Sequence, residues 1–208
     1  MPINVGIHEP TTGGKRVKNT LIWIDEKGEI TQRYQKLHLF DVEIKGGPVL
    51  KESNSVEPGS AILPPFQTGL GFMGLMICFD LRFPALSARI RDLSAQVLTY
   101  PSAFTVPTGK VHWETLLRAR AVETQSFVVA AAQVGAHNVG RVSYGHSMII
   151  DSWGKVVCEL GGVEEWDKSG KEPVIGIGEV DLEQLEKVRR EMPLHPRRDV
   201  VDVVEKSD

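Results

Sequence analysis

Cys78 is one of only two cysteines in the 208-residue chain, and it lies between an apolar run, Phe72–Ile77, and Pro84, a residue typical of a helix start. A cysteine that attacks a carbonyl carbon must be a thiolate, and a helix N-terminus offers positive potential and free N–H groups that favour the anion. The same N–H groups can stabilise an oxyanion. An isolated cysteine is nevertheless more often a packed core thiol. Both interpretations of Cys78, nucleophile and core residue, therefore stay open at this point.

A lysine and a glutamate upstream of this cysteine have side chains that suit attack on a carbonyl group. Lys36 follows the strand-like run Ile30–Tyr34, and a lysine ammonium can stabilise the negative charge that develops on the carbonyl oxygen. Glu52 lies in a long stretch, residues 39–65, that is rich in Gly, Pro, Ser and Asn. Loops of that length in a compact domain are often functional. Taken singly, a lysine and a loop glutamate are most often solvated surface residues.

The charged residues that follow the cysteine have less specific interpretations. Asp80 and Arg82 place charge next to it in the sequence. Glu114 stands in the first turn of a predicted helix, where an acid favours the helix dipole. Arg120 and Glu123 are three residues apart on that helix, and we expect a surface ion pair that contributes little stability.

Other motifs are weak or absent. The six histidines show no metal-ligand spacing, and the chain has neither Cys-x-x-Cys nor His-Glu-x-x-His, so the sequence predicts no metal site. Gly176 and Gly178 lack the third glycine of a dinucleotide-binding loop and are interpreted as strand glycines. The basic C-terminal stretch is expected to be a solvated face or an oligomer contact rather than an RNA site; its members are Arg189, Arg190, Arg197 and Arg198.

Strand patterns and helix patterns alternate along the middle of the chain. Two hairpins are predicted, at Leu21–Ile24 with Ile30–Tyr34 and at His146–Ile150 with Lys155–Glu159. The other predicted strands are Phe72–Cys78, Ala95–Tyr100, Phe127–Ala132 and Val174–Val180, and the predicted helices are Pro84–Leu93, His112–Gln125 and one capped by Asp181 that runs to about Glu191. This order predicts an α/β fold, a mixed sheet with helices packed on it. The chain is expected to be a single domain, residues 1–208, with a polar tail from about residue 193.

Composition excludes several function classes. The net charge of −3 gives no general attraction to nucleic acid or anionic membranes, and no apolar run approaches a membrane span. Two cysteines form no disulfide framework, which suits a reducing compartment. We see no signal peptide and expect a cytoplasmic protein, with a mitochondrial form as the alternative.

Taken in order, the residues that could take part in catalysis and their neighbours resemble one family, the nitrilase-like carbon–nitrogen hydrolases. The stretches that carry the resemblance are Tyr34-Gln-Lys36-Leu-His38, Glu52-Ser-Asn-Ser with Pro58-Gly59, Gly74-Leu-Met-Ile-Cys78-Phe-Asp80-Leu-Arg82-Phe-Pro84, Tyr100-Pro-Ser-Ala-Phe104, His112-Trp-Glu114, Arg118-Ala-Arg120-Ala-Val-Glu123 and Tyr144-Gly-His146-Ser. The likeness covers the chain from about Val5 to Arg198. Asp41-Val-Glu-Ile and Val128-Val-Ala-Ala-Ala-Gln133 are most similar to the deaminated glutathione amidase branch, and the ω-amidase branch is the nearest rival.

The resemblance implies roles for individual residues. The nucleophilic cysteine maps onto Cys78, and the catalytic lysine maps onto Lys36, which would stabilise the oxyanion together with a backbone N–H near Phe79. A second glutamate that orients the lysine maps onto Glu52. Substrate contacts are expected from Phe79, Arg82, Ser102, Phe104, Glu114 and Tyr144. No metal or organic cofactor is implied, and pairing of helices would give a homodimer or a larger homo-oligomer.

The resemblance also implies a nitrilase-like α-β-β-α sandwich that is incomplete at its N-terminus. The family has a glutamate general base on an early strand in a Pro-Glu context, and this sequence starts at what resembles the family's third strand. Glu9 lies on a neighbouring stretch and does not match that motif. We therefore expect an N-terminally truncated form that lacks the first catalytic glutamate.

The expected function is hydrolysis of a small carboxylate-bearing primary amide, with deaminated glutathione as the expected substrate, through a cysteine thioester and with release of ammonia. The nearest alternative is an ω-amidase acting on 2-oxoglutaramate. Two others belong to different classes: a catalytically impaired binding or regulatory protein, favoured by the absent general base, and an enzyme that transfers the acyl group to an acceptor other than water.

Overall fold

A computed structural model describes residues 1–43, 49–169 and 172–197. The strands of the two main sheets are β1 (Ile3–Pro10), β2 (Val17–Ile24), β3 (Ile30–Gln35), β6 (Val56–Glu57), β7 (Phe66–Thr68), β8 (Gly71–Leu75), β9 (Val97–Thr99), β10 (Phe127–Ala130), β13 (Met148–Ile150) and β14 (Val156–Glu159). Two small hairpins are formed by β4 (Asp41–Glu43) with β5 (Val49–Lys51) and by β11 (Val134–Asn138) with β12 (Arg141–Tyr144). The helices are α1 (Pro84–Asp92), α2 (Val106–Thr124), α3 (Val163–Lys168) and α4 (Leu182–Glu191), with short 3₁₀ helices η1 (Glu52–Asn54) and η2 (Cys78–Arg82).

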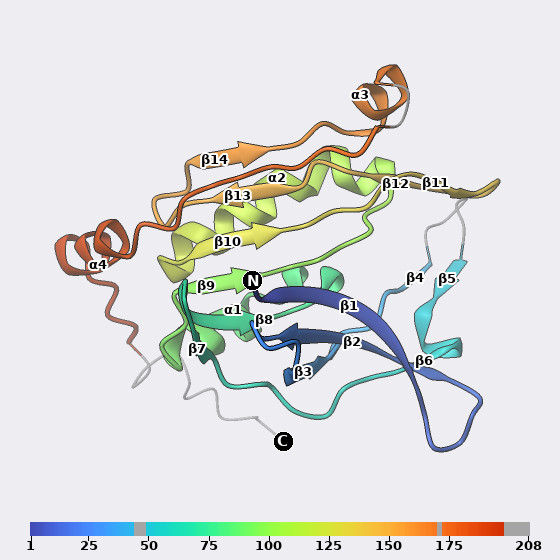
Figure 1. Cartoon of the computed structure of the whole chain (residues 1–208), viewed down its shortest axis with the longest axis horizontal. Helices are drawn as coiled ribbons and strands as arrows, with labels where there is room; N and C mark the ends of the chain where they lie inside the picture. Colours follow the sequence, from blue (N-terminus) through green and yellow to red (C-terminus); the bar gives the residue numbers. More distant parts are fainter. Residues whose placement is uncertain (44–48, 170–171, 198–208) are drawn as a thin grey trace, which may run out of the picture.

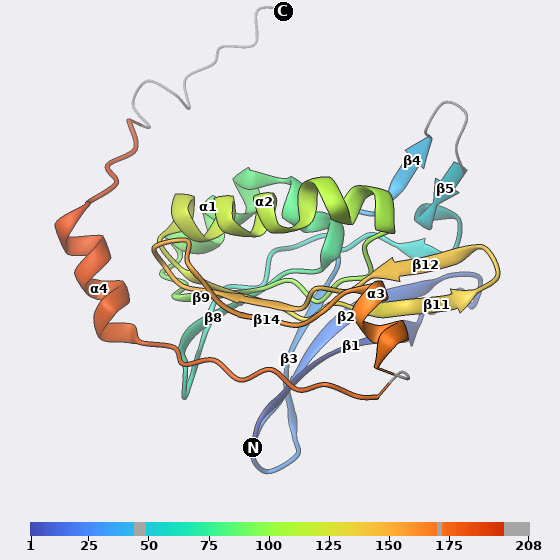
Figure 2. The ribbon, with the colours of Figure 1, turned by 90° about the horizontal axis from the view of Figure 1, so that it is seen from above.

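Three layers make up the body of the protein (Figure 1). A six-stranded sheet has the order β14-β13-β10-β9-β8-β7, and its central strands β8, β9 and β10 run parallel to one another. Helices α1 and α2 cover one face of this sheet, and the sheet of β1, β2, β3 and β6 lies on the other side (Figure 2). Helices α3 and α4 lie at the ends of the layers (Figure 1). The predicted α/β fold with helices packed on a mixed sheet is confirmed.

Two apolar clusters fill the spaces between the layers. One lies under the helices and contains Trp113, Leu117 and Ile90, all at most 1% exposed. The other lies between the sheets, where Leu21 and Tyr34 meet Leu75. Cys78 packs against both clusters, so the end of β8 is the place where the layers converge.

Several sequence predictions are confirmed with small changes of boundary. Both predicted hairpins form, with antiparallel pairing of β2 with β3 and of β13 with β14. Asp181 caps α4, since its side chain accepts a hydrogen bond from the backbone N–H of Gln184 at 2.9 Å. The strand predicted for Phe72–Cys78 ends earlier, at Leu75, because the chain turns into η2 at Cys78. The long stretch 39–65 is not all loop, as it contains β4, β5, η1 and β6.

The helix predicted for His112–Gln125 begins six residues earlier, at Val106. Its first turns contain Pro107, Thr108 and Gly109, which are weak helix formers. The sequence pattern therefore does not indicate where the helix begins. Gly109 is required there, because an added Cβ would lie 2.3 Å from the Tyr144 ring. Glu114 is therefore in the interior of α2 and not in its first turn, so the proposed role at the helix dipole is wrong.

Residues 174–180 were predicted as a strand, and this prediction is wrong. Successive residues do alternate between a face that packs on the protein and a face that is exposed. A Cβ on Gly176 would lie 2.7 Å from the Cys158 sulfur, whereas Ile175 and Ile177 are 86% and 87% exposed. No backbone hydrogen bond joins residues 172–180 to another described residue, so the segment is extended without being part of a ladder. It crosses the sheet beside β14 and leads to α4 (Figure 1).

A buried carboxylate joins the two sheets at the point where they converge. Asp80 is 0% exposed; its Oδ2 accepts hydrogen bonds from the Tyr34 hydroxyl at 2.7 Å and from the Ile77 N–H at 2.9 Å. Its Oδ1 accepts from the His38 N–H at 3.1 Å and from His38 Nδ1 at 2.8 Å. Burial, with a smaller contribution from Asp80, raises the pKa of Tyr34 far above its usual value, so the phenol stays protonated and donates. One carboxylate thus fastens the chain on both sides of Lys36 to the turn that contains Cys78.

We expect Asp80→Asn to lower the free energy of unfolding by about 3 kcal/mol, because the amide NH₂ would face donors and the network would lose its charge. Tyr34→Phe removes one hydrogen bond and should cost about 1 kcal/mol. The measurement is urea unfolding, with Asp167→Asn, an exposed aspartate on α3, as the matched control. An Asp80→Asn protein as stable as this control would contradict the role of Asp80.

Candidate active site

Lys36 and Glu52 form an ion pair that is largely buried from solvent. Lys36 follows directly after β3, its side chain is 3% exposed, and its Nζ lies 2.6 Å from Oε2 of Glu52. The Glu52 carboxylate also accepts hydrogen bonds from the Phe40 N–H at 2.7 Å and from the Asn19 side-chain amide at 3.2 Å. Burial raises the pKa of Glu52, but the Lys36 ammonium and these hydrogen bonds outweigh it, and the net shift is downward. Glu52 is therefore an anion that faces the Lys36 side chain.

The backbone around Lys36 is fixed on both sides. Its N–H donates to the Asn19 carbonyl at 2.9 Å, and its carbonyl accepts from the Gly59 N–H at 2.8 Å. A Cβ at position 59 would lie 2.4 Å from the Gln35 carbonyl oxygen, so only glycine allows this approach. The Pro58-Gly59 pair in the sequence thus marks the place where a loop closes over the lysine.

The backbone of Cys78 has a left-handed conformation that residues other than glycine rarely adopt. Its φ is +45°, and its backbone N–H donates to the Pro101 carbonyl at 3.1 Å. The strand, turn and helix predicted around it are present as β8, η2 and α1, and Cys78 is partly exposed. The backbone N–H of Phe79 has no acceptor among the residues described, so it is available to an oxyanion.

Aromatic contacts bring the Lys36 segment against the Cys78 turn. The His38 ring stacks on Phe83 with centroids 3.6 Å apart, and Phe40 meets the edge of Phe79 at 5.0 Å. Together with the Asp80 hydrogen bonds, these contacts hold the segment that carries Lys36, with its partner Glu52, against the turn that begins at Cys78. Roles for them in catalysis remain predictions at this point.

The predicted substrate residues divide into two groups. Phe79, Arg82 and Phe104 lie together, because the Arg82 guanidinium carbon is 5.8 Å from the Phe79 ring centre and 5.5 Å from that of Phe104. Burial lowers the pKa of Arg82, and the negative charge of a Cys78 thiolate acts in the opposite direction. Arg82 therefore lies within electrostatic reach of the cysteine.

The remaining three are placed less directly. The Ser102 hydroxyl donates to the Tyr100 carbonyl at 2.9 Å and is buried. Glu114 is exposed and pairs with Arg118 at 3.4 Å. Tyr144 lines a cavity of about 370 Å³ with Lys110 and His146, and burial followed by nearby carboxylates raises its pKa. The lining of this cavity places Tyr144 beside α2 and α3, and it includes neither Cys78 nor Lys36.

Arg120 corrects another expectation. Its pairing with Glu123 is present, but the arginine side chain is 5% exposed and its Nε donates to the Leu81 carbonyl at 3.1 Å. Arg120 is therefore a buried residue that links α2 to η2 by a hydrogen bond, and the expectation of a surface ion pair is wrong for it.

Sequence reasoning missed the residues that position the site: Asn19, Phe40, Tyr34, His38 and the central role of Asp80. One signal was present. Tyr34, Lys36 and His38 alternate, and alternate residues of an extended chain share a face. Three polar side chains on one face of a chain that enters the core need buried partners. Asp80 is the partner of Tyr34 and His38, and Glu52 is the partner of Lys36. The part of the chain that the structure describes has no group of three or more metal-binding side chains and no helix able to span a membrane.

Comparison with known proteins gives consistent results. The family model described as carbon–nitrogen hydrolase matches residues 1–190. The chain is 47% identical over 203 residues to "Probable hydrolase nit2" of Schizosaccharomyces pombe, covering 97% of this chain and 71% of that protein. It is 44% identical to human deaminated glutathione amidase over 88% of this chain, and spans about half of that protein's length, 54%.

Solved structures show the same likeness. The Caenorhabditis elegans NitFhit protein superposes with a TM-score of 0.87 at 43% identity, covering 96% of this chain and 47% of that one. A mutant of the amidase from Nesterenkonia, described with covalent addition of the acetamide moiety of fluoroacetamide at its active-site cysteine, gives a TM-score of 0.71 at 25% identity, covering 92% and 65%. Because the family model spans nine-tenths of the sequence and the fold agrees, the chain belongs to the carbon–nitrogen hydrolase family.

Proposed function

We propose that this chain carries the nucleophile half of an amidase site that cleaves a small carboxylate-bearing amide through a thioester on Cys78. The observation that carries the proposal is the buried Lys36 ammonium, neutralised by Glu52, on a segment that Asp80 fastens to the Cys78 turn. Burying a charged lysine costs free energy. A catalytic role for Lys36 would explain why the protein bears that cost. The covalent cysteine adduct named for the Nesterenkonia amidase supports the same assignment.

The reaction divides into two displacements. The Cys78 thiolate attacks the amide carbon, and the Lys36 ammonium and the Phe79 N–H stabilise the oxyanion. The C–N bond then breaks, the nitrogen leaves with the electron pair and takes a proton, and a thioester remains. Water attacks the thioester, the C–S bond breaks, and the acid and the thiolate are released. The net change adds one water across the amide bond.

A proton acceptor is also needed, and Glu52 is poorly suited to that task. Its pKa is lowered and its oxygens already accept hydrogen bonds from Lys36, Phe40 and Asn19, so its affinity for a proton is low. Glu9 pairs with Arg33 at 3.3 Å, and Glu114 pairs with Arg118 on the outside of α2. Neither is placed as a base for Cys78 by any contact in the described residues. A second candidate function, ligand binding without turnover, follows from this arrangement.

Arg82 indicates the substrate class. It is a partly buried cation, and within the described part of the chain no carboxylate lies within 4.0 Å of its guanidinium. A substrate carboxylate would provide the missing counter-ion. Deaminated glutathione and 2-oxoglutaramate suit this site equally, since both present a 2-oxoglutaryl group with a terminal carboxylate. The first is a secondary amide that releases a dipeptide amine, so the expectation of a primary amide and of ammonia release is wrong for it. The second is a primary amide and does release ammonia.

A homodimer in the cytoplasm is also proposed. Val111 and Val122 are 66% and 47% exposed and lie about three turns apart on the same face of α2, which a second copy would cover. The two cysteines are free, which suits a reducing compartment.

The proposed function predicts release of 2-oxoglutarate from both substrates by the 208-residue chain. Cys78→Ala should abolish this release and also labelling by fluoroacetamide, whereas Cys158→Ala should change neither. Product and label are measured by mass spectrometry. Equal labelling of the two variants would remove Cys78 as nucleophile. Labelling without turnover would favour the binding function, and turnover that depends on an added amine would favour acyl transfer.

Lys36 and Glu52 should act as one unit. We expect Lys36→Met to lower kcat by about 10²–10³-fold, because the charge facing the oxyanion is lost. Glu52→Gln should lower kcat by about 10-fold, since it acts only through the lysine. The double variant should then equal Lys36→Met. Additive losses in steady-state kinetics would show that Glu52 acts independently.

Arg82 should determine recognition rather than chemistry. Arg82→Met is expected to raise KM for 2-oxoglutaramate by about 10–100-fold, the range of a charge-assisted hydrogen bond. KM for 4-oxopentanamide, which has a methyl group in place of the carboxylate, should not change. Arg141→Met, at an exposed arginine on β12, is the control. Equal losses for both amides would contradict carboxylate recognition by Arg82.

A further inference from the structure

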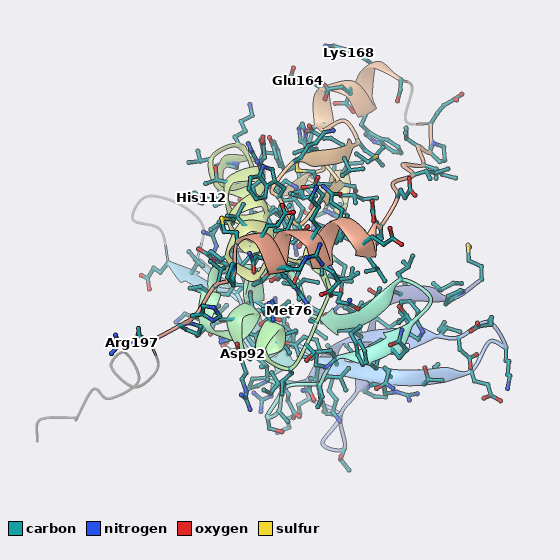
Figure 3. The ribbon with its side chains drawn as sticks, turned by 90° about the vertical axis from the view of Figure 1, so that its left-hand side faces the viewer. Met76, Asp92, His112, Glu164, Lys168 and Arg197 are labelled. Carbon is teal, nitrogen blue, oxygen red and sulfur yellow. The ribbon has the colours of Figure 1, made fainter. Side chains whose placement is uncertain are left out.

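Arg82 is confined on three sides by groups of different kinds. Two are the rings of Phe79 and Phe104, which restrict the plane of the guanidinium. The third is His112 on α2, whose Nδ1 lies 3.2 Å from Nη2 of Arg82. Figure 3 shows His112 on this helix. Aromatic rings allow a guanidinium to slide over them, so the histidine is the contact that fixes its direction.

The chemistry of this contact defines the state of the histidine. An arginine can only donate hydrogen bonds, so Nδ1 of His112 must be the acceptor, and the proton of the neutral ring is on Nε2. The Nε and Nη1 atoms of Arg82 make no hydrogen bond within the described residues. Those N–H groups remain available to a carboxylate, which the planar fork of arginine binds with two parallel hydrogen bonds.

The turn of α2 that carries His112 is itself firmly held. The neighbouring Trp113 is 1% exposed, its ring packs on Phe104 at 4.7 Å, and its indole N–H donates to the His146 carbonyl at 2.7 Å. Two turns further along α2, the buried Arg120 donates to the carbonyl of Leu81, the residue before Arg82. Helix α2 therefore holds the backbone next to Arg82 through Arg120 and the Arg82 guanidinium through His112.

We propose that His112 is a positioning residue that directs the Arg82 guanidinium toward the substrate carboxylate. This inference rests on the proposed function, because it takes Arg82 as the group that binds the carboxylate. His112 does not touch the amide carbon or the thiolate in this arrangement. Its removal should therefore weaken binding of the acidic end of the substrate and leave the chemical step unchanged.

Two substitutions separate the hydrogen bond from the bulk of the side chain. His112→Leu removes the acceptor and keeps an apolar branch of similar reach. His112→Asn places Oδ1 where Nδ1 was and restores an acceptor for Arg82. Because His112 is exposed, both variants are expected to fold with unchanged thermal stability. His8→Leu, at an exposed histidine on β1, is the matched control.

The first readout is the pair of amides. We expect His112→Leu to raise KM for 2-oxoglutaramate by about 3- to 10-fold, the value of one exposed hydrogen bond, with kcat unchanged and with no effect on 4-oxopentanamide. His112→Asn should return KM to within about 2-fold of the original protein, which is below the contribution of one such bond. An unchanged KM in His112→Leu, or an equal loss in His112→Asn, would overturn the proposal.

The second readout does not need turnover. Calorimetric Kd values for 2-oxoglutarate and for 4-oxopentanoate, which lacks the second carboxylate, are measured on the same variants. A loss of 2-oxoglutarate affinity in His112→Leu that His112→Asn restores supports the positioning role even if the 208-residue chain hydrolyses neither amide. Binding that is insensitive to Arg82→Met would overturn both the recognition role of Arg82 and the proposal for His112. Binding that depends on Arg82 but not on His112 would overturn the proposal alone.

Discussion

The Asp80 carboxylate is the group on which the rest of the site depends. A fully buried anion must be satisfied by hydrogen-bond donors, and among the described residues the donors to Asp80 come from Tyr34, Ile77 and His38. These residues belong to strands of different sheets or to the segments that directly follow them. Satisfying one charge therefore fixes the distance between the segment that carries Lys36 and the turn that starts at Cys78. The acid that organises the site is not one that reacts.

Burial divides the site into two parts with different physics. Lys36 and Glu52 are almost removed from water, so each of their charges acts strongly on a reacting group and costs much if left alone. Arg82 and His112 lie nearer to the solvent, where a hydrogen bond contributes less and can exchange with water. Strong, dry interactions suit the chemical step. Weaker, wetter ones suit recognition of a substrate that must also leave.

Local patterns in the sequence predicted most of the elements that position the site. The hairpins, the β8–α1 passage and the Asp181 cap could be predicted because turn residues, apolar periodicity and capping act over a few positions. The early start of α2 could not, since Gly109 is set by contact with Tyr144. Arg120 looked like a surface residue because helical spacing alone does not show that Leu81 covers it.

The same limit applies to the site and to the C-terminal segment. Cys78, Lys36 and Glu52 could be singled out by residue type and by family resemblance, whereas the contact between Arg82 and His112 joins residues thirty positions apart and leaves no local pattern. Residues 174–180 have the alternation of a strand, but a strand also needs a neighbour, and a pattern in one segment contains no information about its partner.

The left-handed backbone of Cys78 has a consequence for how this sequence can change over time. A residue with a Cβ at a φ of +45° costs about 1–3 kcal/mol, and glycine would relieve most of that cost. A lineage selected only for a stable fold would therefore drift toward glycine at position 78. The cysteine in this chain therefore occupies position 78 against the preference of its own backbone, and the thiol costs the fold stability that glycine would return.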